Sequence, residues 1–157
     1  MSQDIKRDKP ANGRIMGIDF GSKRIGISIS DPTLTIAQGL IVFENNSAVF
    51  NKIKEICLEY GVSLIVVGFP VSLNGRYSSK TKEVLEFIDK LKSILNVDVV
   101  KWDERFTTKI AQRAKIEMNL KKSKRQKKEF DDLIASTLIL QSYLDFLKNK
   151  EKMIEKE

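Results

Sequence analysis

Acidic side chains at the ends of the expected strands and helices are the groups most able to do chemistry in this chain. Asp19 ends an apolar run and precedes a glycine, and Glu104 follows a later apolar run. Asp131 and Asp132 stand where a long amphipathic helix is expected to begin. In α/β sheets, ligand sites gather where strands end. Three carboxylates meeting there could hold Mg²⁺ or Mn²⁺, orient a phosphate and activate water, so the pattern favours metal-assisted hydrolysis of a phosphate ester.

The composition removes most competing chemistries. The chain has no histidine and a single cysteine, Cys57. Without histidine there is no Ser-His-Asp or Cys-His catalysis and no histidine-ligated zinc. One cysteine cannot form an internal disulfide or a thiolate metal site. Any metal bound by side chains must therefore rely on carboxylates, and oxygen ligands favour hard cations such as Mg²⁺ or Mn²⁺.

Each acid also has a plainer interpretation when it is considered alone. Asp19 before Gly21 could be a turn aspartate, and Glu104 could form a surface ion pair with Arg105. The two adjacent aspartates could simply favour a helix start through its dipole. At about 100° per residue, Asp132 lies roughly 110° from the centre of the helix's apolar face and Asp131 roughly 150°. Asp132 is therefore the better ligand candidate, and Asp131 could assist it or merely cap the helix.

The positive charge of the chain is concentrated in one run. The net charge is +7, from 28 basic and 21 acidic residues. Six of the basic residues fall within eight positions, with no acid among them: Lys121, Lys122, Lys124, Arg125, Lys127 and Lys128. Such a run suits contact with the phosphates of a nucleic acid. The alternative is a solvated linker that has no partner.

The hydrophobic pattern predicts the elements that would position these groups. Apolar runs around the polar residues 20–23 indicate a hairpin across 14–30. Further along, the pattern predicts strands at 40–43, 64–67 and 97–102, a helix capped by Ser47 and ended by Gly61, a helix at 79–95, a short helix at 108–118 and a last helix at 130–148. This order predicts an α/β fold whose mixed central sheet has antiparallel early strands and parallel later strands, flanked by helices.

The length of 157 residues suits one domain. We expect a disordered extension at 1–13, a single nuclease domain at 14–148 and a charged tail at 149–157. No apolar run is long enough to span a membrane, and the first residues lack the apolar stretch of a secretory signal. The expected location is therefore the cytoplasm.

Four ordered motifs resemble the YqgF (RuvX) family. They are IDFGSKRIG at 18–26 with SDP at 30–32, VVGFP at 66–70, WDERFTT at 102–108, and Asp132 followed by Ala135 and ILQSYL at 139–144. The resemblance spans about 14–146. It implies an RNase H-like fold related to Holliday-junction resolvases, and a nuclease role in maturing the 5′ end of precursor 16S ribosomal RNA during ribosome biogenesis.

The resemblance also assigns roles to individual positions. Asp19, Glu104 and Asp132 match the family's catalytic, metal-binding acids, and Lys23, Arg24 and Arg105 match its basic neighbours, which would contact substrate phosphate. Two departures stand out. Phe69 replaces the usual leucine, and the second glycine expected after Gly75 is missing.

The leading hypothesis is therefore a hydrolase that cuts phosphodiester bonds in precursor ribosomal RNA, free or on the ribosome. One alternative is a resolvase of branched DNA, which usually needs a symmetric dimer; the sequence leaves monomer and homodimer open. Another is a non-catalytic nucleic-acid or ribosome-binding module. Trp102 and Phe106 could stack on a base, although core packing is favoured for Trp102.

Overall fold

The structure, a computed structural model, describes residues 13–70, 78–107 and 124–155. It opens with the expected hairpin, in which β1 (Arg14–Phe20) pairs antiparallel with β2 (Arg24–Ser30). The turn between them needs a glycine because a Cβ on Gly21 would lie 2.5 Å from the carbonyl oxygen of Arg24. The side-chain amide of Asn45 donates to the Gly21 carbonyl at 2.8 Å and braces the turn.

A five-stranded mixed sheet forms the centre of the molecule. Its strand order is β3-β2-β1-β4-β5, with β3 at Ala37–Glu44, β4 at Val62–Phe69 and β5 at Asp98–Asp103. The first three strands pair antiparallel, whereas β4 runs parallel to both β1 and β5. The predicted change from antiparallel to parallel pairing is thus confirmed.

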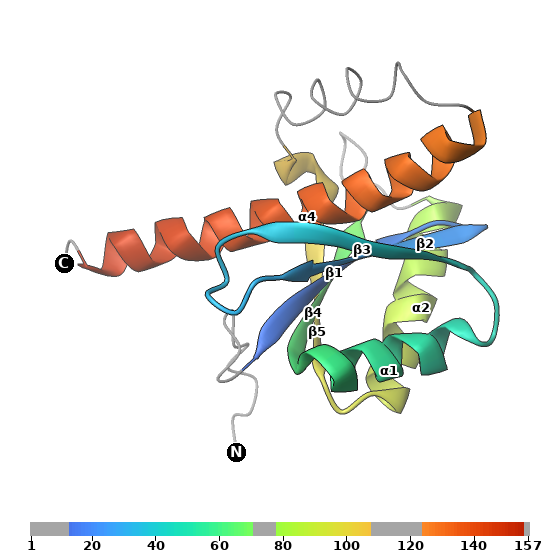
Figure 1. The fold of residues 1–157 in the computed structure, drawn as a ribbon, viewed down its shortest axis with the longest axis horizontal. Helices are drawn as coiled ribbons and strands as arrows, with labels where there is room; N and C mark the ends of the chain where they lie inside the picture. Colours follow the sequence, from blue (N-terminus) through green and yellow to red (C-terminus); the bar gives the residue numbers. More distant parts are fainter. Residues whose placement is uncertain (1–12, 71–77, 108–123, 156–157) are drawn as a thin grey trace.

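Helices cover both faces of this sheet. α1 (Val49–Tyr60) and α2 (Ser79–Ile94) pack on one face, and α4 (Lys124–Glu155) crosses the other (Figure 1). Alternate residues of β1, β4 and β5 feed two separate hydrophobic clusters, one under each layer of helices, whereas the isoleucines of β2 feed only the cluster under α1 and α2. Within the described ranges, no helix is long and apolar enough to cross a membrane.

The ends of the first two helices can be compared with the capping residues predicted from the sequence. Gly61 ends α1 in the left-handed conformation, with a φ of 67°, as expected. The Ser47 cap was wrong: α1 starts after Ala48 without a side-chain cap on that residue, and Asn46 Oδ1 instead accepts from the Ala48 N–H at 3.0 Å. α2 begins with a reciprocal capping box between Ser78 and Thr81.

The last helix is longer than the predicted 130–148. α4 begins at Lys124 and ends at Glu155, because no glycine or proline interrupts this stretch and its polar ends lie beyond the apolar periodicity. Asp131 and Asp132 therefore lie inside the helix and not at its start. Residues 1–12 of the extension expected at 1–13, the helix expected at 108–118, and Lys121 and Lys122 of the basic run lie outside the described residues.

Candidate active site

Asp19 lies on the face of the sheet that α4 covers. In β1, side chains alternate, so Asp19 points the same way as Ile15 and Gly17, and Ile15 belongs to the cluster beneath α4. Across the hairpin, Asp19 pairs with Gly26. On its other side Ile18 pairs with Val67, so the next step along the two parallel strands sets Gly68 beside Asp19. The acid thus stands between two positions that have no side chain.

Asp132 of α4 occupies the space above the first of these glycines. A Cβ on Gly26 would lie 2.2 Å from the carbonyl oxygen of Asp132 and 3.5 Å from its Cβ, so the helix rests directly on the strand. One turn further along, Ser28 Oγ donates to the carbonyl of Ser136 at 2.8 Å and fixes the helix on the sheet. The predicted choice of Asp132 as the aspartate nearer the sheet agrees with this contact.

The carboxylate of Asp132 is held by a neighbouring cation. Arg24 Nε donates to Asp132 Oδ2 at 2.6 Å, and both side chains are only partly exposed. The hydrogen bond and the charge of Asp132 raise the pKa of Arg24 above its usual value. Arg24 precedes Gly26 by two residues on β2, so it points to the same face of the sheet.

Glu104 occupies the space above the second glycine. It opens the short 3₁₀ helix η1 (Glu104–Phe106) that follows β5. A Cβ on Gly68 would lie 3.0 Å from Glu104 Oε1 and 2.5 Å from the end of Ile139. Burial raises the pKa of Glu104; the charge of Lys80 acts against this rise, and that of Asp103 adds to it. Glu104 is thus a partly buried carboxylate aimed at the strand beside Asp19.

The three acids therefore share one face of the sheet, on three adjacent strand positions. Sequence reasoning named the acids but missed Gly26 and Gly68, which make room for two of them. The signal was available, because a hairpin register places Gly26 opposite Asp19. Lys80 was also missed, and nothing in the pattern of α2 distinguishes it from the other surface lysines.

The acids of the site are not arranged as a preformed metal site in this structure. Among the described residues, no three acidic, cysteine or histidine side chains are close enough to share a metal ion. Asp132 is paired with Arg24 instead. The donor chemistry nevertheless suits a hard divalent cation, because every candidate ligand is a carboxylate oxygen.

The predicted basic residues differ in whether they form ion pairs or lie exposed to solvent. Arg105 grips Asp103 through two nitrogens, with Nε at 2.9 Å and Nη2 at 2.7 Å from Asp103 Oδ2. The suggested surface pair of Arg105 with Glu104 is therefore replaced by a pair with Asp103. Lys23 is exposed at the hairpin turn, and Lys128 is exposed on α4. Lys124, Arg125 and Lys127 lie in the first turns of α4.

A mostly apolar cavity of about 670 Å³ adjoins η1. Trp102 forms one wall; its ring meets Tyr143 edge-on at 5.0 Å, and its Nε1 donates to Ser142 Oγ at 2.7 Å. Phe106 and Phe146 also line the cavity, and both rings are partly exposed to solvent. Trp102 is thus anchored against α4, as the core-packing interpretation expected, while it also contributes a surface to this cavity.

Comparison with known structures defines the class of fold. Thermus thermophilus RuvC bound to a Holliday junction matches with a TM-score of 0.57 at 14% identity, covering 87% of this chain and 97% of that one. The fowlpox virus resolvase bound to the same kind of junction matches with a TM-score of 0.54 at 14% identity, covering 85% and 98%. The chain therefore has the RNase H-like fold of these resolvases, as the sequence predicted.

Sequence comparison then defines the family. The RuvX family profile, described as Holliday junction resolvase, matches residues 13–146. A relative from Thermoanaerobacter pseudethanolicus, named "Putative pre-16S rRNA nuclease", is 45% identical over 87% of this chain and 99% of its own length. One from Acetivibrio thermocellus with the same name is 46% identical over 84% and 95%. The chain belongs to the RuvX family, and the resemblance seen in its motifs is confirmed.

Proposed function

We propose that this chain is a metal-dependent nuclease that hydrolyses phosphodiester bonds near the 5′ end of precursor 16S ribosomal RNA. The observation that carries the proposal is the placement of Asp19 between two glycines, with Asp132 packed over one and Glu104 over the other. The names of the RuvX relatives support the substrate. A cytoplasmic location is part of the proposal, since ribosome precursors are its substrate.

The acids of the site would hold one or two Mg²⁺ or Mn²⁺ ions. Asp19, Glu104 and Asp132 are the proposed ligands, and Asp131 is a further candidate on the same turn as Asp132. A bound divalent ion supplies a water of lowered pKa and neutralises charge on the leaving oxygen. The chain itself keeps Glu104 partly buried beside Gly68, and Arg24 pairs with the carboxylate of Asp132.

The basic residues would bind the substrate backbone on either side of the acids. Lys23, Arg24 and Arg105 flank the site. The basic run continues into the helix that carries Asp132: Lys128 and Lys124 precede Asp132 by one and two turns, about 6 and about 12 Å along the axis. The proposed path of the substrate therefore follows α4 away from the acids, and Lys121, Lys122, Arg125 and Lys127 would extend this contact.

The test is a cleavage assay, in which purified protein is incubated with a precursor ribosomal RNA and Mn²⁺. We expect the wild type to shorten the 5′ end and Asp19→Asn and Glu104→Gln to lose this activity while remaining folded by circular dichroism. Asp89→Asn, which changes an exposed acid on α2, is the matched control and should cleave normally. Full activity in Asp19→Asn would remove that residue, and with it the proposed site, from the mechanism.

A second candidate is a resolvase of branched DNA. The fold likeness to two junction-bound resolvases favours it. Cutting both strands of a junction symmetrically would call for a homodimer with two sites. The same assay should therefore include a four-way DNA junction, together with sedimentation to determine oligomeric state. Preferential cleavage of the junction by a dimer would replace the RNA proposal with this one.

A non-catalytic nucleic-acid or ribosome-binding module is the remaining alternative, because the basic run by itself explains binding. Such a module has no need of the three acids. Titration with Mn²⁺ separates the two: a thermal shift that Asp19→Asn and Glu104→Gln reduce supports the nuclease. Unchanged melting in Mn²⁺, together with intact precursor RNA, would support the binding module.

A further inference from the structure

The aromatic cavity beside η1 has no part in the site described above. We call it the aromatic pocket; its main lining residues are Trp102, Phe106, Leu138, Gln141, Ser142 and Phe146. Its volume of about 670 Å³ falls in the range of small-ligand sites. The walls come from β5, η1 and α4, the elements that carry Glu104 and Asp132.

The rings of the aromatic pocket are left facing solvent at an energetic cost. Phe106 is 59% exposed and Phe146 is 40% exposed. Their ring centres lie 5.0 Å and 5.3 Å from that of Trp102, so the three rings form one continuous surface. Clustered exposed apolar groups of this kind mark binding sites on soluble proteins.

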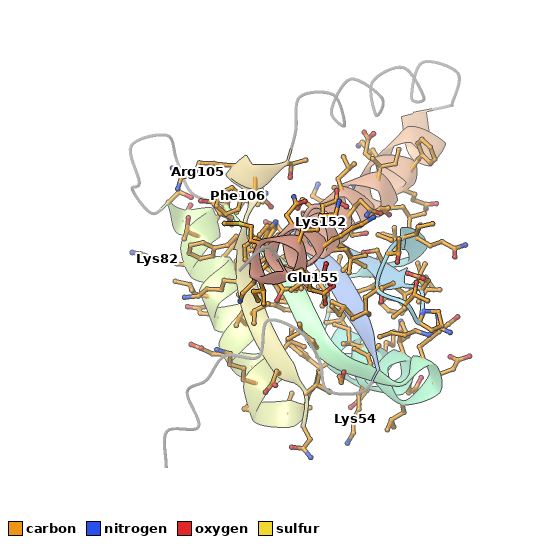
Figure 2. The ribbon with its side chains drawn as sticks, turned by 90° about the vertical axis from the view of Figure 1, so that its left-hand side faces the viewer. Lys54, Lys82, Arg105, Phe106, Lys152 and Glu155 are labelled. Carbon is orange, nitrogen blue, oxygen red and sulfur yellow. The ribbon has the colours of Figure 1, made fainter. Side chains whose placement is uncertain are left out.

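The aromatic pocket lies next to the catalytic acids. Phe106 follows Glu104 by two residues in the same turn of η1. Leu138 precedes Ile139, whose side chain contacts the Gly68 position beside Glu104. Figure 2 shows Arg105 and Phe106 together at the end of β5. A substrate strand held at Glu104 would therefore pass the mouth of this pocket.

The chemistry of the lining selects a flat, uncharged ligand. Among the described residues that line the pocket none is basic, and Asp145 is acidic, so a phosphate would be repelled. Gln141, Ser142 and Asn149 offer amide and hydroxyl groups around the aromatic surface. Nucleobases present the matching features, a π face for stacking and hydrogen-bonding edges.

We propose that the aromatic pocket binds an unpaired nucleobase of the substrate strand, adjacent to the bond that is cut. This inference rests on the proposed nuclease function and adds a selection for single-stranded or looped substrate. Stacking on Phe106 and Trp102 supplies the binding energy, while Arg105, which pairs with Asp103, does not line the pocket. A fully paired helix would not fit, because its bases are not free to stack on protein rings.

The chain provides its own reporter for this proposal, because Trp102 is the single tryptophan. A base that enters the pocket should quench its fluorescence. We would titrate a short single-stranded oligoadenylate, and as a comparison a blunt RNA duplex of equal length, into Asp19→Asn protein, which prevents turnover. The expected result is saturable quenching by the single strand and little quenching by the duplex.

Substitutions at Phe106 separate stacking from general apolar contact. Phe106→Ala and Phe106→Leu should weaken oligoadenylate binding by roughly 5- to 150-fold, the value of one stacked base, whereas Phe106→Tyr should restore it. Phe106 is exposed, so these variants should fold. Leu58→Ala, which removes a side chain 76% exposed on α1, is the matched control and should bind normally.

The outcomes separate this proposal from the nuclease function. Unchanged oligoadenylate binding in Phe106→Ala, with precursor cleavage intact in the otherwise wild-type protein, overturns the pocket alone. Base binding that depends on Phe106, without any cleavage by the wild type, keeps the pocket and removes the nuclease. Phe106→Ala that dissociates a dimer while oligoadenylate binding is unchanged would make this surface an interface between copies and overturn the proposal.

Discussion

Two glycines decide how closely the proposed catalytic acids Asp132 and Glu104 approach the sheet. Gly26 faces backbone, since its Cβ would meet the Asp132 carbonyl, whereas Gly68 faces the end of Ile139 and one oxygen of Glu104. A helix backbone cannot yield easily, but a flexible side chain can. The two positions should therefore respond differently to the same added methyl group.

We predict that Gly26→Ala destabilises the protein more than Gly68→Ala. The first should cost about 1–3 kcal/mol by overpacking, because α4 must move away from β2. The second should cost less in stability while displacing Glu104 and lowering kcat. Urea denaturation together with cleavage rates measures both effects. Equal stability losses, with kcat unchanged in Gly68→Ala, would contradict the assigned packing.

Arg24 competes with any cation for Asp132. The guanidinium lies 2.6 Å from the carboxylate, so a metal ion must share or replace this contact. We predict that Arg24→Gln binds Mn²⁺ more tightly than the wild type in the absence of nucleic acid. An ion pair of this exposure is worth up to about 1 kcal/mol, which corresponds to roughly fivefold in affinity.

Calorimetric titration with Mn²⁺ measures this difference without relying on activity. Lys23→Gln removes a positive charge from the exposed hairpin turn nearby and so controls for the general change in charge. Weaker Mn²⁺ binding by Arg24→Gln than by this control would show that Arg24 organises Asp132 for the metal and does not compete with it.

At the scale of elements, the loop between β2 and β3 is organised by one carboxylate. Asp31 accepts from the backbone N–H groups of Thr35 at 2.7 Å and Ile36 at 2.8 Å, and from the hydroxyl of Thr33. These hydrogen bonds lower the pKa of Asp31 to about 2. The loop also holds Leu34 in a left-handed conformation, with a φ of 60°, which a branched side chain rarely adopts without such support.

We predict that Asp31→Ala lowers stability at neutral pH by about 1–2 kcal/mol. Because the pKa is depressed in the folded state, the stabilisation is present above the unfolded value of 3.8 and is lost as the pH falls toward 2. Denaturation curves across this range should show wild type and variant converging at low pH. A difference that stays constant with pH would assign the effect to packing.

The sequence predicted helices and strands correctly where their apolar periodicity and turn residues agreed with the tertiary packing. The hairpin, the buried strand β4 and helix α2 follow from apolar periodicity and turn residues alone. The extent of α4 did not, because its polar ends show no periodicity that marks their limits. The Ser47 cap failed because α1 begins one residue later than expected, after Ala48, and the side chain that accepts a backbone N–H there belongs to Asn46.

The candidate site was predictable as residue identities but not as contacts. The motifs identified Asp19, Glu104 and Asp132, and helical geometry preferred Asp132 to Asp131. The pairing of Arg24 with Asp132 depends on how α4 lies across β2, which no local pattern encodes. The aromatic pocket likewise depends on Phe106 and Phe146 meeting from elements that are far apart in the sequence.

At the scale of the whole molecule, the start of one helix carries both a basic run and a proposed metal ligand. α4 carries Asp132 over the sheet, and its first turn and a half contain Lys124, Arg125, Lys127 and Lys128. Lys124 and Lys128 are four residues apart, about 6 Å along the helix axis. This arrangement lets one helix hold both the proposed metal ligand Asp132 and the proposed contact with the RNA backbone.

We predict that Lys124→Gln with Lys128→Gln weakens RNA binding and reduces its dependence on salt. Removing one lysine–phosphate pair should lower the slope of log affinity against log salt concentration by about 1. The matched control is Lys54→Gln with Lys92→Gln, which removes the same charge from exposed positions on α1 and α2. If both double variants reduce the slope equally, the net charge of the protein drives binding. A reduction confined to the α4 variant places the RNA backbone along this helix, because counterions are released only where a lysine contacts a phosphate.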